Sequence, residues 1–414
     1  MNKKLSGIRC VLAARFIASA YWVIGLFWFT AVVFTVSPVA VATPFVPNDP
    51  AQIIERLPFK PGDASVRELR EQRAALTREP DNIKLAVQAA RDYMTRGRAE
   101  GDPRFFGYAE GALGPWWNLP NPPEDVLLLR AKLHQVNHDF AAALTDLDLL
   151  LKSDPNNLNA WLTRAIIFQV QGKYAEAQKN CAPLLQIPSL KLTGLSCVSS
   201  VASFNGAAQA SYDALYKGLE GRADITPEDR QWALTILADI AARTGQTAVA
   251  ERHFKDALML GPDIWLLGAY ANFLLDQGRP TEVIELLKDE TSVDNLLLLL
   301  TLAEQAVNAP ALAKHVLMLR ERFAASRLRN DMRHRREEAR FTLHILHEPR
   351  EALKLAQENW AVQREPEDAR VLLEAALAAE DIKAAQPVLK FLTESGLEDV
   401  HLDGLVKQVK AQPV

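Results

Sequence analysis

The chain repeats itself with a period of about 34 residues, and a period of this length restricts the folds that it can adopt. Residues 127–155 align with residues 161–189 without a gap. Matching residues in the two stretches are Arg130 and Arg164, Ala131 and Ala165, Phe140 and Tyr174, and Ala143 and Ala177. Such a repeat is typical of a unit of two helices whose apolar faces are buried only by neighbouring units. We therefore expect an array of helix pairs.

Composition and local signals favour helices in this array. Apolar residues make up 49% of the chain and charged residues 24%, whereas glycine contributes only 19 of 414 residues. The paired alanines are small where two helices would cross closely. Gly172 is expected to end the first helix of its pair at positive φ, and Pro155 to begin the next unit. The expected fold class is therefore all-α.

With these positions the unit resembles the tetratricopeptide repeat. The best copy has Leu237, Ala238, Gly245, Ala250, Phe254, Ala257 and Pro262 at pattern positions 7, 8, 15, 20, 24, 27 and 32. Weaker copies extend the resemblance over residues 80–395. It implies a right-handed α-solenoid of about eight or nine units, which we place at residues 80–400. Residues 43–79, with five prolines, are expected to form a tether, and residues 401–414 a C-terminal tail.

The resemblance also implies a concave groove lined by the first helices of the units. The lining residues, which we call the candidate groove, are Leu128, Lys132, Gln135, Asn159, Thr163, Ile166, Gln169, Trp232, Asp239 and Arg243. The Lys/Asn/Arg set with which chaperone-binding members hold a terminal carboxylate is absent from these positions. This mixed, partly apolar surface suits an extended peptide or a partner helix. The alternative is that one stretch of it packs an internal segment of the same chain.

Residues 1–42 predict export from the cytoplasm. Residues 16–36 carry no charge, and as a helix they would span ~31 Å, enough to cross the hydrocarbon core of a membrane. Four basic residues, Lys3, Lys4, Arg9 and Arg15, precede this run, and no charge follows it until Asp49. The basic residues are expected to stay in the cytoplasm, so that the rest of the chain lies outside it.

Two interpretations of this segment remain open. A signal peptide cleaved after Ala42 agrees with the small residues at 40 and 42, and an uncleaved anchor agrees with the length of the apolar run. Both place the body outside the cytoplasm. The absence of any Asn-x-Ser/Thr sequence favours a bacterial periplasm, with the protein either soluble or tethered to the inner membrane.

Three cysteines are present, and one of them, Cys10, lies in the export segment. Cys181 and Cys197 therefore form an even pair in the exported body. In the repeat register, Cys181 takes position 24 of a second helix, and Cys197 lies in the next first helix, which packs there. An oxidising compartment would allow a disulfide, worth ~3 kcal/mol for a loop of this length. The alternative is two buried thiols.

Motifs for catalysis are missing. The chain has no Gly-rich phosphate loop, no Gly-x-Ser-x-Gly and no Cys-x-x-Cys, so we expect neither an enzyme nor a cofactor. His344 and His347 lack a third ligand for a metal. The net charge is −4 although residues 1–42 are basic, and this acidic body argues against a nucleic-acid partner. These observations favour an extracytoplasmic scaffold that binds a protein or peptide during assembly, secretion or maturation of an envelope component.

The alternative function is docking to anionic lipid or another polyanion. The docking element would be a helix at residues 320–340, which contain eight arginines and four acids, and Arg327, Arg333, Arg336 and Arg340 are the candidate contacts. The competing interpretation is a solvated helix face with ion pairs at i, i+4. The neighbouring tryptophans Trp116 and Trp117 are expected to fill the gap between two helix pairs, or else to stack on a peptide or sugar ring.

Overall fold

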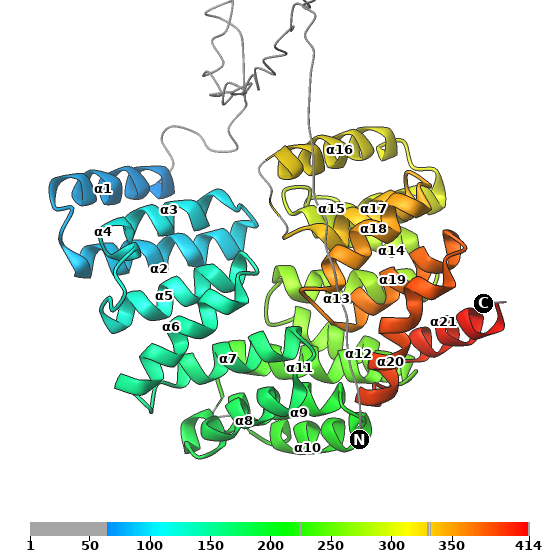
Figure 1. Cartoon of the computed structure of the whole chain (residues 1–414), viewed down its shortest axis with the longest axis horizontal. Coiled ribbons are helices and arrows are strands. Elements are labelled where there is room, and N and C mark those ends of the chain that lie inside the picture. Colours follow the sequence, from blue (N-terminus) through cyan, green and yellow to red (C-terminus); the bar gives the residue numbers. More distant parts are fainter. Residues whose placement is uncertain (1–63, 223–224, 329–330, 332, 413–414) are drawn as a thin grey trace, which may run out of the picture. The chain divides into compact units, whose positions relative to one another are not determined.

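The computed structural model describes residues 64–222, 225–328, 331 and 333–412, and the regular structure of these residues is helical throughout. Helices follow one another in pairs along the described chain (Figure 1). The first helices of the pairs are α2 (Ile83–Glu100), α5 (Glu124–Val136), α7 (Leu158–Val170), α9 (Lys191–Ser203), α11 (Pro227–Arg243), α13 (Ile264–Asp276), α15 (Asp294–Val307), α17 (Arg335–His344) and α19 (Pro366–Ala378).

The second helices pack beside them. They are α3 (Arg104–Ala112), α6 (Phe140–Ser153), α8 (Tyr174–Leu185), α10 (Ala208–Leu219), α12 (Thr247–Leu258), α14 (Pro280–Leu287), α16 (Leu312–Leu328), α18 (Pro349–Trp360) and α20 (Gln386–Ser395). The remaining elements are α1 (Ala64–Arg78) and α21 (Val400–Ala411) at the ends of the described chain, and α4 (Gly114–Trp117) and the 3-10 turns η1 (Pro188–Leu190) and η2 (Ile382–Ala385) in connections.

The period of the sequence is present in the helices themselves. The first helices α5 and α7 begin at Glu124 and Leu158, and the second helices α6 and α8 begin at Phe140 and Tyr174, so both pairs of helices are separated by the same interval. The repeated alanines are buried as expected, with Ala131 and Ala143 at 0% exposure. Such small side chains let the two backbones of a pair approach closely. The period of the helices and the buried alanines together confirm the prediction of a tetratricopeptide-like helical repeat.

The corners between paired helices use left-handed backbone. Gly172 lies there at φ 71°, as expected, and a Cβ atom at this residue would come within 2.6 Å of the Phe391 ring. His138 occupies the equivalent corner one period earlier, at φ 59°. A histidine at positive φ is unusual, because its Cβ crowds the backbone.

Arg130 explains why an arginine stands where the repeat pattern has leucine. Its guanidinium is buried and bonds both carboxylate oxygens of Asp146, each at 2.7 Å. It also donates to the backbone carbonyls of Trp117 and Leu119. These bonds fix the connection between α4 and α5. Trp116 and Trp117, at the end of α4, lie half-buried against the first apolar cluster. The two tryptophans therefore fill space between helix pairs, as expected.

Three expected boundaries need correction. Helix α1 lies inside the stretch predicted as a tether, where Leu69 and Leu76 pack against the first apolar cluster. Helix α21 replaces the predicted C-terminal tail, because Leu402 and Val409 are buried and Asp399 caps its first turn. The arginine-rich stretch forms two helices, α16 and α17, and not one.

The predicted membrane-crossing segment, residues 16–36, lies outside the described residues. Within the described residues, every helix is too short or too polar to cross a membrane.

Candidate functional site

The α5–α7 part of the candidate groove presents half-buried and exposed side chains. Lys132 Nζ donates to Asn159 Oδ1 at 3.4 Å, which joins the two helices. Burial lowers the pKa of Lys132, and the positive charges of Arg98 and Arg91 lower it further. Leu128 and Gln135 are half-buried, and Ile166 is 36% exposed. This part offers both apolar surface and polar side chains to a ligand.

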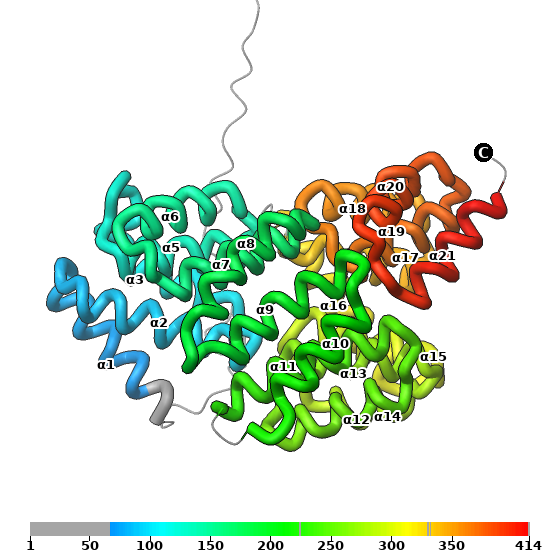
Figure 2. The backbone as a smooth tube through the Cα atoms, turned by 90° about the horizontal axis from the view of Figure 1, so that it is seen from below, coloured from blue at the N-terminus to red at the C-terminus, as the bar shows by residue number. Residues whose placement is uncertain are grey.

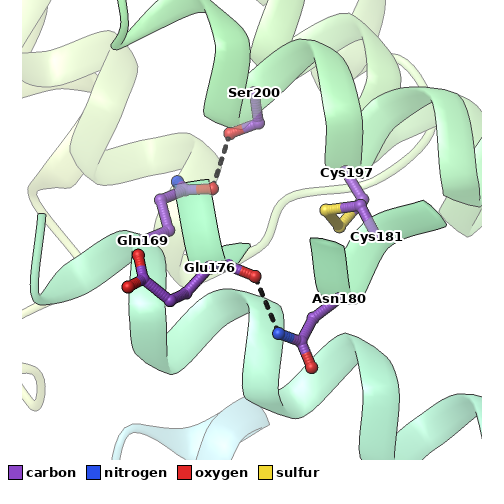
Figure 3. The surroundings of a disulfide bond; sticks show 6 residues. All are labelled: Gln169, Glu176, Asn180, Cys181, Cys197 and Ser200. Atoms are coloured by element: carbon purple, nitrogen blue, oxygen red, sulfur yellow. Dashed lines mark hydrogen bonds between the residues drawn. A yellow bond between two sulfur atoms is a disulfide. The ribbon is translucent and has the colours of Figure 1, made fainter. Parts of the chain in front are cut away.

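Two residues of this part have internal roles. Thr163 is buried, and its hydroxyl donates to the backbone carbonyl of Asn159 at 2.7 Å. Gln169 accepts a hydrogen bond of 3.3 Å from the Ser200 hydroxyl on α9 (Figure 3). Thr163 therefore packs the helix interface and does not line an open surface, whereas Gln169 remains half-buried at the surface.

The α11 part of the candidate groove is covered by the chain itself. Arg243 is only 6% exposed, and its Nη1 donates to the backbone carbonyl of Glu398 at 3.1 Å. Nε of the same guanidinium donates to Asp239 Oδ2 at 2.9 Å. Trp232 is half-buried and packs between two apolar clusters. The prediction of an open lining is therefore wrong for Arg243, and the alternative of an internal segment applies here.

We use "the seam" for the contacts that residues 363–401 make with the corners and helix ends at residues 138–276. Figures 1 and 2 show α19–α21, in orange to red, beside α9–α13, in green. Most seam contacts are polar. They comprise Gln363 Nε2 to His138 Nε2 at 3.0 Å, Arg364 N–H to Val170 C=O at 2.8 Å, Ala208 N–H to Glu398 Oε1 at 3.0 Å, Arg370 to Asp276 at 2.8 Å and His401 to Asp276 at 3.5 Å.

One aromatic side chain supplies the main apolar contact of the seam. The ring of Phe391 lies 6.0 Å from the ring of Tyr174 and 5.3 Å from that of Trp360, and it lies over Gly172. The sequence offered no signal for these contacts, because a repeat pattern describes neighbours in the array and not distant units.

A pocket of about 160 Å³ lies between α11 and α13 on one side and α19 and α21 on the other. Its lining includes the ionisable side chains of Asp239, Asp276, Arg370, Asp399 and His401. Burial raises the pKa of Asp399, whose carboxylate accepts the N–H groups of His401 and Leu402 at the start of α21. Each of these side chains already has a partner in the fold.

Cys181 and Cys197 form a disulfide in the structure (Figure 3). The bond joins α8 to α9, so it links the second helix of one pair to the first helix of the next, with the Cα atoms 5.6 Å apart. Both cysteines are buried. The site is therefore structural in character and remote from solvent.

The four arginines proposed for anionic docking are not gathered into one exposed patch. Arg336 bonds Glu365 at 3.1 Å and Asp368 at 3.3 Å, and Arg340 donates to Asn272 at 2.7 Å. The other two pairs are Arg333 with Asp331 and Arg327 with Glu338. Of the four, only Arg327 exposes more than half of its side chain. Their partners lie mostly on other helices, so the solvated face with i, i+4 pairs is also wrong.

His344 and His347 have different surroundings in the structure and share no ligand. His344 Nε2 lies 2.9 Å from Glu374 Oε2, whereas His347 lies exposed in the following turn at φ 58°. Burial alone would raise the pKa of Glu374, but the His344 hydrogen bond and the charge of Arg370 bring it to about 2. No group of three potential metal ligands occurs in the part of the chain that the structure describes.

No protein-family model and no curated protein sequence matches the chain. Among solved structures it is similar to the crystal structure of the P58(IPK) TPR domain, with 15% sequence identity and a TM-score of 0.24. The match covers 80% of this chain and 97% of that one. The repeat fold of the present chain rests on its own helix pairs.

Proposed function

We infer that this chain is an extracytoplasmic scaffold that binds a protein or peptide partner through the face of α5 and α7. The observation that carries this inference is the composition of that face, where Ile166 is solvent-exposed and Leu128, Lys132, Gln135 and Gln169 are half-buried. Apolar side chains next to side-chain amides suit an extended segment or an amphipathic helix. A role in assembly, secretion or maturation of an envelope component fits this chemistry.

The location outside the cytoplasm is part of the same proposal. It is supported by the uncharged run at residues 16–36, the basic residues before it and the cysteine pair of the body. The membrane contributes as a partner only if that run is retained as an anchor.

Docking to anionic lipid or a polyanion has less support. Arg333, Arg336 and Arg340 are mostly buried and bonded to groups of the same chain. A polyanion would therefore have to displace these internal partners before it could bind.

The test is a partner-binding assay with substitutions on the proposed face. A partner captured by the full-length protein is first identified, and its affinity is then measured for Gln135→Glu, Gln169→Glu and Ile166→Ala. We expect each change to weaken binding at least fivefold while the melting temperature stays the same. Gln408→Glu, at an exposed position on α21, is the matched control and should bind as the wild type does. Affinities within twofold of the wild type for all three variants would place the partner elsewhere.

Trp232→Ala is unsuitable as a binding probe. Because the indole packs between two apolar clusters, we expect its removal to lower stability, and a loss of binding would then have two explanations.

A further inference from the structure

Residues 397–399 cross the seam without regular secondary structure. They connect α20 to α21, and Asp399 has β-region backbone angles, with φ −154° and ψ 116°. Glu398 makes two contacts in this position. Its backbone carbonyl accepts from Arg243 Nη1 at 3.1 Å, and its carboxylate accepts the N–H of Ala208 at 3.0 Å.

The groups that hold Glu398 are themselves oriented. Arg243 Nε bonds Asp239, and Nη2 donates to the Ser203 hydroxyl at 2.9 Å. Ala208 opens α10, a helix of 12 residues whose N-cap, Ala207, has no side chain that could accept its N–H groups. A carboxylate from outside the helix therefore fills the role of the missing cap.

Those two contacts are the ones that an extended acidic ligand would make. An arginine side chain donates hydrogen bonds to a backbone carbonyl, and the N–H groups at a helix N-terminus donate to an acidic side chain. The occupant in this structure is a segment of the same chain, distant in sequence by 155 residues from Arg243.

The seam is built unlike the core of the array. The helices from α17 to α21 have an apolar cluster of their own, whose buried members lie between Ala339 and Val409. None of those buried members comes from α7–α13. Opening the seam would therefore expose polar groups together with the ring of Phe391, which packs partly against the apolar cluster of α7–α9 and partly against that of α17–α21.

We propose that residues 397–399 are an internal ligand, and that a partner's extended acidic segment takes their place at Arg243 and Ala208 when the seam opens. This proposal rests on the proposed function, because it assumes that the array binds a protein partner. It adds the class of partner, an extended segment with a carboxylate, and a competition between that segment and the C-terminal helices.

The test uses the full-length protein and a fluorescein-labelled peptide with the sequence of residues 394–403, ESGLEDVHLD. The seam is weakened by Phe391→Ala together with Glu398→Ala, which removes the main apolar contact and the carboxylate. We expect this variant to bind the peptide at least tenfold more tightly than the wild type in fluorescence anisotropy. Adding Arg243→Gln should abolish the gain, and a peptide with lysine in place of its central Glu398 should not show it.

Two results would overturn the proposal. One is equal, weak binding of the peptide to the wild type and to the weakened variant. The other is a gain that survives Arg243→Gln, since the peptide would then bind somewhere else, and the C-terminal helices would be a fixed part of the fold.

Hydrogen exchange shows whether the weakened variant is still folded. The backbone N–H groups of Arg364 and Ala208 donate across the seam, so they should exchange at least tenfold faster in the weakened variant, while α5 and α15 keep the wild-type rates. If exchange accelerates everywhere, the single variant Glu398→Gln replaces the double one, with an expected gain of about threefold in peptide affinity. Absence of that gain also contradicts the proposal.

The two proposals fail separately. If the peptide shows no gain while Gln135→Glu and Gln169→Glu still weaken partner binding, only the internal ligand is refuted. If the peptide gains affinity while those substitutions leave the partner unaffected, only the α5–α7 face is refuted.

Discussion

His138 should make the stability of the seam depend on pH. Its Nε2 accepts a hydrogen bond from the Gln363 side chain at 3.0 Å, which requires an unprotonated nitrogen. Burial lowers the pKa of His138 to about 4, with the charge of Glu337 opposing and those of Arg336, His334 and Arg333 assisting. The corner therefore holds a neutral imidazole at a pH where an exposed histidine begins to take up a proton.

The sign and size of the effect follow from this depressed pKa. The unfolded chain binds the proton near pH 6.5 and the folded chain only near pH 4, so stability falls as the pH drops through that interval. Without solvent screening, the free energy of unfolding would fall by about 2 kcal/mol between pH 6.5 and pH 5, at ~1.4 kcal/mol per pH unit. Because His138 keeps partial access to solvent, we expect ~1–2 kcal/mol.

The assay compares the wild type with His138→Asn in urea unfolding at pH 7.5 and pH 5.0. Asparagine tolerates positive φ and can still accept from Gln363. The free energy of unfolding of the variant, relative to the wild type, should rise by ~1–2 kcal/mol between the two pH values. His347→Asn is the control, since His347 is exposed and also has positive φ. A difference between wild type and His138→Asn that is the same at both pH values would refute the reasoning.

Three further predictions concern other parts of the chain. Non-reducing mass spectrometry of the protein isolated from cells should find Cys181 and Cys197 linked, and two alkylatable thiols would contradict both the bond and the proposed compartment. Asp146→Asn should lower the free energy of unfolding, measured in urea, by about 3–5 kcal/mol, because it leaves the buried Arg130 guanidinium without its anion. A loss below about 1 kcal/mol would mean that water reaches this ion pair. A phosphatase active only outside the cytoplasm, fused after Val414, should be active, and a well-expressed but inactive fusion would reverse the proposed topology.

Much of the array could be predicted because its signals are local. The sequence period located successive helices, and the small residues Ala131 and Ala143 are buried where the pattern required them. The Cys181–Cys197 pair followed from the same register, since position 24 of one unit faces the next unit.

The partners across the fold could not be predicted, because no repeat pattern encodes contacts between distant units. Arg243 lies on a first helix as expected, but Glu398, which covers it, is 155 residues away. The arginine-rich stretch shows the same limit. Spacing suggested pairs at i, i+4, whereas Arg336 bonds Asp368, 32 residues further along the chain and on another helix.

The distances in sequence across the seam set an order of events during synthesis. Gln363 follows His138 by 225 residues, and Glu398 follows Arg243 by 155. At ~5–20 residues per second, Arg243 is made ~8–30 s before the segment that covers it. In the growing chain, Arg243 and the N-terminus of α10 therefore lack their contacts with Glu398 for this interval. A partner that meets the chain while it is being made or exported needs no opening step, whereas one that arrives later must compete with the C-terminal helices.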